Sequence, residues 1–207
     1  MKVKLINGLK NGYIKEFYYN GQLKFEGEYL NGKKNGNSKE YNLNGRLEFE
    51  GKYINDERNG YGKEYYQNKL VFEGEYLNNK KRNGKYKEYN YNNILIYEGE
   101  YLNGEKNGYT KIYDEDNGKL LIEGEYLNGE KNGYIKEYNI YGNLIFEGEY
   151  IKGARNGKGK EYYDNNKLIF EGEYLNNERW NGKGNQYNYK GILYEGEYIN
   201  GKWKEKG

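Results

Sequence analysis

The stretch EGEYLNGEKNGY occupies residues 98–109, and the same twelve letters occupy residues 123–134. A catalytic loop is needed once, so a duplicated stretch of this length indicates a structural module of a repeat protein. The frame extends in both directions when the chain is aligned on the residue before each Glu-Gly pair. That residue recurs every 23 to 25 positions, at Phe25, Phe49, Phe72, Tyr97, Ile122, Phe146, Phe170 and Tyr194.

The repeat frame accounts for the whole chain. Residues 1–24 form a partial first repeat, residues 25–193 form seven full repeats, and residues 194–207 form a partial last repeat with a charged tail. No linker or second domain remains outside this frame, so we expect a single repeat array.

The alternation of side chains predicts strands. In KLIFEGEYL, residues 167–175, the residues Leu168, Phe170, Gly172 and Tyr174 share one parity and polar residues dominate the other, which is typical of a half-buried strand. Asn-Gly pairs between such runs predict tight turns. We therefore predict an all-β fold, an elongated, single-layer, twisted antiparallel sheet of stacked β-hairpin repeats. It would be an open meander of about 17 strands, two from each full repeat.

A single sheet has no second layer, so its aromatic rings must cover one another. A glycine column lies between two ring columns, and without a Cβ each glycine would let a tyrosine from a neighbouring strand lie against the backbone. Edge-to-face ring pairs would each add about 0.5–1.5 kcal/mol. The structural glycines predicted in this way are Gly27, Gly51, Gly74, Gly99, Gly124, Gly148, Gly172 and Gly196.

Composition excludes several classes of protein. The 29 tyrosines argue against disorder, despite a mean hydropathy of -1.31. A net charge of +2 gives no general attraction to nucleic acid. The chain has 0 His and 0 Cys, which removes the commonest metal ligands and general bases. Without a signal-peptide pattern or a long apolar run, we expect a cytoplasmic protein.

Three stretches resemble chemical sites, and each has a simpler structural interpretation. The carboxylate pair Glu26 and Glu28 recurs in almost every repeat, which indicates a solvated face rather than a glycosidase site. DEDNG, residues 114–118, places its glycine one residue early for a calcium loop. GARNGKGK, residues 153–160, lacks the spacing of a phosphate loop. We expect no enzymatic activity, catalytic residue, metal or cofactor.

These motifs together resemble the MORN repeat family. YEGEYLNG at residues 97–104, GKGKEYY at residues 157–163 and NGKL at residues 117–120 carry the resemblance, which covers the whole chain. It implies an elongated single-layered sheet that serves as a scaffold and binds protein partners in an aromatic groove. Tyrosine replaces the usual second tryptophan, and Asn-Gly replaces the His-Gly of many members. Features of a bacterial variant, whose members include antitoxins, leave the organism class open.

The expected function is therefore protein–protein interaction through a tyrosine-lined face. Two alternatives stay open: an antitoxin or immunity-like inhibitor that binds a toxin, and a peripheral phospholipid-binding module. We also expect a homodimer through the closing strand, residues 194–202, with Trp203 at the two-fold contact. The partner-binding face is predicted to consist of Tyr53, Tyr76, Tyr101, Tyr126, Tyr150 and Tyr174.

Overall fold

The structure is a computed structural model that describes residues 5–163, 166–187 and 193–206. The chain divides into two compact units. The first comprises Met1–Glu88 with Glu100–Gly104, and the second comprises Tyr89–Gly99 with Glu105–Gly207. The predicted fold class is confirmed, because the described part of the chain is all-β and its strands form open antiparallel sheet.

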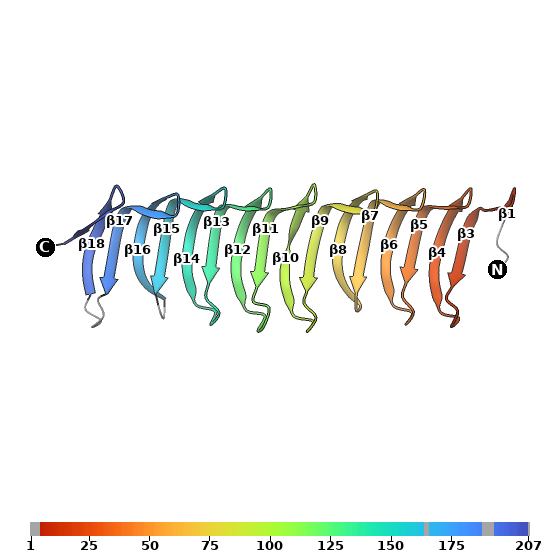
Figure 1. Ribbon diagram of the computed structural model, residues 1–207, viewed down its shortest axis with the longest axis horizontal. Coiled ribbons are helices and arrows are strands. Elements are labelled where there is room, and N and C mark those ends of the chain that lie inside the picture. Colours follow the sequence, from red (N-terminus) through yellow and green to blue (C-terminus); the bar gives the residue numbers. More distant parts are fainter. Residues whose placement is uncertain (1–4, 164–165, 188–192, 207) are drawn as a thin grey trace. The chain divides into compact units, whose positions relative to one another are not determined.

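In the first unit, every strand from β3 to β8 pairs antiparallel with the strand that follows it in sequence (Figure 1). A separate two-stranded pair precedes them. The strands of this unit are β1 (Leu5–Ile6), β2 (Leu9–Lys10), β3 (Gly12–Phe17), β4 (Leu23–Leu30), β5 (Lys33–Tyr41), β6 (Leu47–Ile54), β7 (Glu57–Tyr66), β8 (Lys69–Leu77) and β9 (Lys80–Tyr89).

The second unit repeats the same meander from β11 to β19. Strand β10 (Leu95–Leu102) contributes residues to both units. The remaining strands are β11 (Glu105–Tyr113), β12 (Leu120–Leu127), β13 (Glu130–Tyr138), β14 (Leu144–Ile151), β15 (Ala154–Tyr163), β16 (Lys167–Leu175), β17 (Glu178–Tyr187), β18 (Leu193–Ile199) and β19 (Lys202–Glu205).

The C-terminal part differs from the sequence-based expectation. The sequence predicts one closing strand over residues 194–202, but β18 ends at Ile199 and the chain turns back as β19. Trp203 pairs with Tyr198 across this hairpin, and the centroids of their rings are 5.2 Å apart. The indole therefore packs within its own chain, because the second hairpin strand continues the ring row of the repeat.

Most hairpins have a tight turn at one end and a longer turn at the other, although the turn between β7 and β8 contains only Gln67 and Asn68. At the tight turn between β4 and β5, Asn31 has φ 51° and Gly32 has φ 83°. Two consecutive residues with positive φ match the twist of an antiparallel hairpin, and asparagine and glycine reach that region at little cost. Within each unit, Figure 1 shows the tight turns along one margin of the strands and the longer turns along the other.

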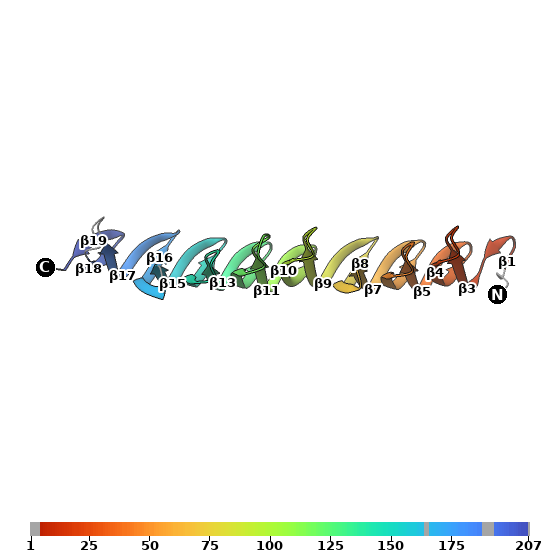
Figure 2. The same cartoon turned by 90° about the horizontal axis from the view of Figure 1, so that it is seen from below.

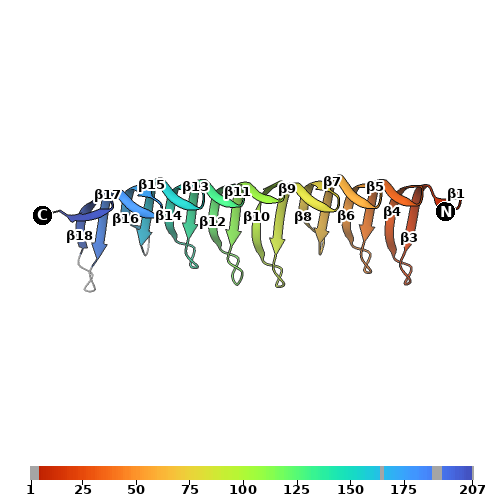
Figure 3. The ribbon, with the colours of Figure 1, turned by 45° about the horizontal axis from the view of Figure 1, so that its top comes forward.

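The strands bend close to the tight turns, and this bend forms the core. Residues four apart in a straight strand are about 13 Å apart, yet the ring centroids of Phe25 and Tyr29 lie 5.5 Å apart. The register shifts between Gly27 and Tyr29, where a bulge re-aims the strand. Figures 2 and 3 show the same bend in successive hairpins of each unit. Each hairpin thereby folds its tight-turn end over the residue before its Glu-Gly pair, which is phenylalanine in five of the eight repeats.

The inside of the bend, which we call the ring face, contains the hydrophobic core. Phe49 is fully buried, and its ring meets the rings of Tyr53 and Tyr76 edge to face, with centroids 5.6 and 5.3 Å away. Phe146 repeats the arrangement in the second unit with Tyr150 and Tyr174. Ring pairs between adjacent hairpins thus provide the second layer that a single sheet lacks.

The predicted glycines lie where a Cβ would collide, although the colliding group differs from the expectation. A Cβ on Gly51 would lie 2.7 Å from Gly62 Cα and 2.7 Å from Phe49 Cζ. The contacting ring therefore belongs to the phenylalanine two residues earlier in the same strand rather than to a neighbouring tyrosine. The facing backbone supplies the other contact, and at Gly124 the Tyr134 carbonyl oxygen would be 2.3 Å away.

Candidate functional site

Five of the six tyrosines predicted as a partner-binding face lie in the core. Tyr101 is partly exposed, and the other five are at most 7% exposed. The bend of each strand folds these rings inward, as it folds Tyr53 against Phe49 and Tyr174 against Phe170. The ring face therefore does not present them to a partner. The five buried rings are Tyr53, Tyr76, Tyr126, Tyr150 and Tyr174.

A layer of charged side chains covers the rings on the ring face. The Arg58 guanidinium lies over the Phe49 ring and donates hydrogen bonds to Tyr53 Oη at 3.2 Å and to Glu40 at 2.9 Å. Burial alone would raise the pKa of Glu40, but hydrogen bonds from Lys34 and Arg58 outweigh it and lower that pKa. The chain's own cations thus cover the exposed sides of the rings on the ring face.

The opposite side of the sheet, which we call the Glu face, carries the glutamate of each Glu-Gly pair. A tyrosine of the following strand donates its hydroxyl to this glutamate, as Tyr41 does to Glu26 and Tyr138 does to Glu123, both at 2.8 Å. Strand pairing dictates the contact, since Glu26 faces Lys39 and Tyr41 lies two residues further along the same side of β5. Tyr65 and Tyr162 make the equivalent bonds.

A second tyrosine approaches the same glutamate from the preceding strand. Tyr109 donates to Glu123 at 2.8 Å and Tyr134 donates to Glu147 at 2.9 Å, so each of these carboxylates accepts two phenols. Tyr61 makes the equivalent bond to Glu73. Tyr61, Tyr109 and Tyr134 are each about half exposed. The Glu face, for which the sequence predicted only solvated carboxylates, therefore carries a set of half-exposed tyrosines.

The titration behaviour of these groups suits hydrogen bonding rather than catalysis. Hydrogen bonds from Lys15 and Tyr41 lower the pKa of Glu26, and burial together with the bond to Glu147 raises the pKa of Tyr134 to about 12. At neutral pH the carboxylates are ionised acceptors and the phenols are protonated donors. A general acid or base needs the opposite arrangement, with its pKa moved toward neutrality.

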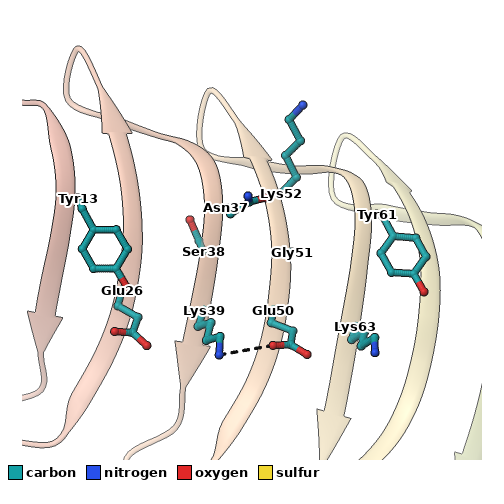
Figure 4. Close-up of a pocket in the computed structure, with 10 residues that line it drawn as sticks. All are labelled: Tyr13, Glu26, Asn37, Ser38, Lys39, Glu50, Gly51, Lys52, Tyr61 and Lys63. Carbon is teal, nitrogen blue, oxygen red and sulfur yellow. Dashed lines mark ion pairs between the residues drawn. The ribbon is translucent and has the colours of Figure 1, made fainter.

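The row of second tyrosines is not continuous, and in the first unit a groove opens where Asn37 stands in the row (Figure 4). Lysine takes the same position at Lys85, Lys158 and Lys183. Asn37 takes the position that Tyr13 and Tyr61 hold in the repeats on either side. The resulting cavity has a volume of about 480 Å³. Tyr13 and Tyr61 line its two ends, and the paired backbone of Ser38 and Gly51 lies between them.

Charged side chains surround this groove. Lys39 Nζ lies 3.7 Å from a Glu50 carboxylate oxygen, the ion pair drawn in Figure 4. Lys63 lines the groove and pairs with Glu73 at 3.3 Å, and Glu26 closes the other end. Lys52 faces Asn37 across the strand pair, where the other repeats carry glutamate. The groove therefore has tyrosine at both ends, two ion pairs along it, and Lys52, which has no ion-pair partner among the described residues.

A smaller groove lies on the Glu face of the second unit. Lys158 replaces the second tyrosine there, and the cavity has a volume of about 270 Å³ between Tyr134 and Glu171. Glu173 faces Lys158, as in the common repeat pattern. This groove therefore lacks the unpaired facing lysine that distinguishes the groove at Asn37.

The structure gives the other chemical candidates a structural role. Asp114 accepts hydrogen bonds from the backbone N–H groups of Asp116 and Asn117, both at 3.0 Å, so DEDNG forms an Asx turn. GARNGKGK lies largely within β15. In the part of the chain that the structure describes, no cluster of acidic side chains could hold a metal ion. Among those residues, no helix has the length and apolar character needed to cross a membrane.

The grooves were missed in the sequence analysis, although the sequence holds a signal for one of them. Asn37 departs from the tyrosine or lysine that fills its position in the other repeats, and Lys52 departs from the glutamate that fills the facing position in every other repeat. Comparison of each column for its exceptions, rather than for its consensus, would have identified the first groove.

The repeat frame agrees with a comparison against protein families. The MORN repeat model matches residues 25–37, 49–71, 97–118, 123–134 and 146–167. A comparison with curated proteins gives no match. MORN repeats are in general modules for interaction with proteins or membranes, and the family is non-enzymatic. Because the matched segments follow the frame of the hairpins from end to end of that span, the chain belongs to the MORN repeat family.

Proposed function

We propose that this chain is a non-enzymatic scaffold that binds a protein partner through its Glu face. One observation carries the proposal: half-exposed tyrosines stand among ionised glutamates and lysines on this face, while the ring face is occupied by the chain's own cations. Tyrosine provides a large contact area with few rotatable bonds to immobilise, and it is enriched at protein interfaces.

The charge pattern favours a protein over an anionic membrane. Lysines on the Glu face are paired with glutamates, as Lys15 is with Glu26 at 2.9 Å and Lys160 is with Glu171 at 3.2 Å. A membrane surface attracts clusters of unpaired Lys and Arg. Alternating charges instead favour recognition of one complementary protein surface and disfavour others.

The test compares two matched sets of tyrosine substitutions in the full chain. One variant carries Tyr61→Ala, Tyr109→Ala and Tyr134→Ala on the Glu face. The control carries Tyr19→Ala, Tyr91→Ala and Tyr141→Ala in the longer turns, where these side chains are even more exposed. Circular dichroism checks that both variants keep their strands.

Each immobilised protein is then used to capture binding proteins from extract of the source cells. We expect the Glu-face variant to lose a protein that the native chain and the turn variant both retain. Equal capture by all three proteins would contradict the proposal. Flotation with anionic vesicles that the Glu-face variant abolishes would assign the face to membranes instead.

A further inference from the structure

The groove at Asn37 has the form of a repeat from which one tyrosine side chain is missing. Tyr109 lies 14 residues before its acceptor Glu123, and Tyr134 lies 13 residues before Glu147. Asn37 stands in the same relation to Glu50, 13 residues later. Four repeats therefore place a tyrosine at this position on the sheet, at Tyr13, Tyr61, Tyr109 and Tyr134, while three others place a lysine there.

The acceptor for the missing hydroxyl is present. Glu50 accepts a hydrogen bond from Tyr65 at 2.8 Å, which is the bond from the following strand. Among the described residues, no second hydroxyl donates to Glu50, whereas Glu123 and Glu147 each accept two. A carboxylate has room for several hydrogen bonds. A phenol that entered the groove would therefore find the same acceptor that the intrinsic tyrosines use.

The walls and the volume also suit a side chain supplied from outside. Tyr13 and Tyr61 leave a cavity of about 480 Å³ above the backbone of Ser38 and Gly51, within the range of about 300–1,000 Å³ that is common for binding pockets. The paired backbone of Ser38 and Gly51 forms the floor of the groove, because the Ser38 side chain and the Cβ direction of Gly51 both point to the ring face. A ring could therefore lie flat on this floor.

Charge adds a second requirement for the occupant. Lys52 faces Asn37, whereas Glu125 faces Tyr109 and Glu149 faces Tyr134. Lys52 is exposed, and within the described part of the chain it has no ion-pair partner. Figure 4 shows its side chain directed away from Glu50, toward the tight-turn end of the strand. An acidic group beside the incoming phenol would meet this ammonium group.

We propose that the groove at Asn37 binds a tyrosine side chain of a protein partner, with an acidic residue next to that tyrosine in the partner's sequence. The phenol donates its hydrogen bond to Glu50, its ring lies between Tyr13 and Tyr61, and the acidic side chain pairs with Lys52. This inference rests on the proposed function, because it names the contact that one part of the Glu face makes.

The experiment uses two peptides, acetyl-Glu-Tyr-Glu-amide and acetyl-Glu-Phe-Glu-amide, titrated into the isotope-labelled full chain. The backbone amide resonances of Ser38, Gly51 and Lys52 report the groove. We expect saturable shifts with the tyrosine peptide. The phenylalanine peptide should bind about ten-fold or more weakly, because it leaves the Glu50 carboxylate without the hydroxyl.

Two variants locate the site. Asn37→Tyr supplies the missing ring from the chain itself, so it should abolish the shifts and keep or raise the melting temperature. Lys158→Tyr makes the matched change at the groove of the second unit, so it should leave the titration unchanged. Lys52→Glu restores the common repeat residue and should weaken binding several-fold, which provides a second test that does not depend on the Asn37 variant.

Three results would overturn the inference: no saturable shift with the tyrosine peptide, equal binding of both peptides, or unchanged binding by the Asn37→Tyr variant. Any of these could occur while the Glu-face alanine variant still loses a captured protein, in which case the scaffold function stands and the groove is not its contact. Shifts produced by anionic vesicles but not by the tyrosine peptide would also overturn it.

Discussion

The guanidinium carbon of Arg58 lies 4.0 Å from the centroid of the Phe49 ring. In the second unit, Arg155 lies 3.9 Å from the centroid of Phe146. A single sheet normally leaves one side of its rings in water, and here a cation that is itself held by a glutamate covers them. The polar composition of the chain is therefore compatible with a closed core, because charged side chains perform part of the covering that apolar residues perform elsewhere.

The contribution of this cation can be measured at Arg155. Arg155→Met removes the contact with Phe146 and the ion pair with Glu137 at 2.7 Å, so it should lower the free energy of unfolding by about 1–3 kcal/mol. Arg155→Lys is the control and should retain most of the stability, because Lys34 holds the equivalent place 4.3 Å from the Phe25 centroid. Denaturant unfolding measures both. A methionine variant as stable as the parent would show that the cation does not contribute to the stability of the fold.

The glycine column gives a second prediction. Gly124→Val should lower the free energy of unfolding by more than about 1 kcal/mol, because its Cβ would lie 2.3 Å from the Tyr134 carbonyl oxygen and its φ of 149° disfavours other residues. Gly129→Asn is the control, since Asn79 adopts φ 64° at the equivalent turn position. Thermal melting compares them, and similar losses in the two variants would count against the packing argument.

The hydrogen bonds of the Glu face give a third prediction. Tyr138→Phe removes the donor to Glu123 and should lower the free energy of unfolding by about 1 kcal/mol. Tyr141→Phe makes the same chemical change at a tyrosine that is 72% exposed in a turn, and it should have no measurable effect. Urea unfolding of the two variants and the parent decides the matter, and equal midpoints for all three would refute it.

Stability should fall at alkaline pH. Burial and the bond to Glu26 raise the pKa of Tyr41 to about 12, and Tyr162 reaches a pKa of about 12 through burial and its bond to Glu147. An unfolded tyrosine loses its proton near its ordinary value of 10, so between pH 10 and about 12 the unfolded state binds fewer protons than the folded state. Stability is complete below pH 10 and decreases through this window.

Phenolate absorbance and circular dichroism, followed together during an alkaline titration, check this expectation. We expect the tyrosines to ionise cooperatively with loss of the strands. Ionisation of most tyrosines near their ordinary pKa, with the strands intact, would contradict it.

The repeat frame, the hairpins and the turns were predictable because each depends on local sequence. Alternation predicts β4, and Asn31-Gly32 predicts the turn that follows it. The bend between Gly27 and Tyr29 was not predictable in this way, because it follows from a bulge in the pairing of two strands. The error in assigning the tyrosine-lined face followed from this, since a straight strand would have left Tyr53 on an open surface.

The groove depends on two residues that are significant only because of their position relative to each other. Asn37 and Lys52 are unremarkable surface residues in isolation, and they become informative only when β5 and β6 place them opposite each other. The pairing brings both exceptions of the repeat pattern to one place. A consensus that treats all repeats as equivalent does not show such exceptions.

The bend that lets each hairpin cover its own core residue also bears on how such a gene can change. Within each unit, ring contacts, ion pairs and hydrogen bonds join residues of one hairpin or of adjacent hairpins, as Arg58 does with Phe49 and Glu40. Unequal recombination that duplicates or deletes one whole copy would therefore rejoin compatible surfaces. The identical segments at residues 98–109 and 123–134 are what a recent duplication would leave. Chain length can then change by whole repeats, while single substitutions, such as the one at Asn37, make the repeats differ from one another.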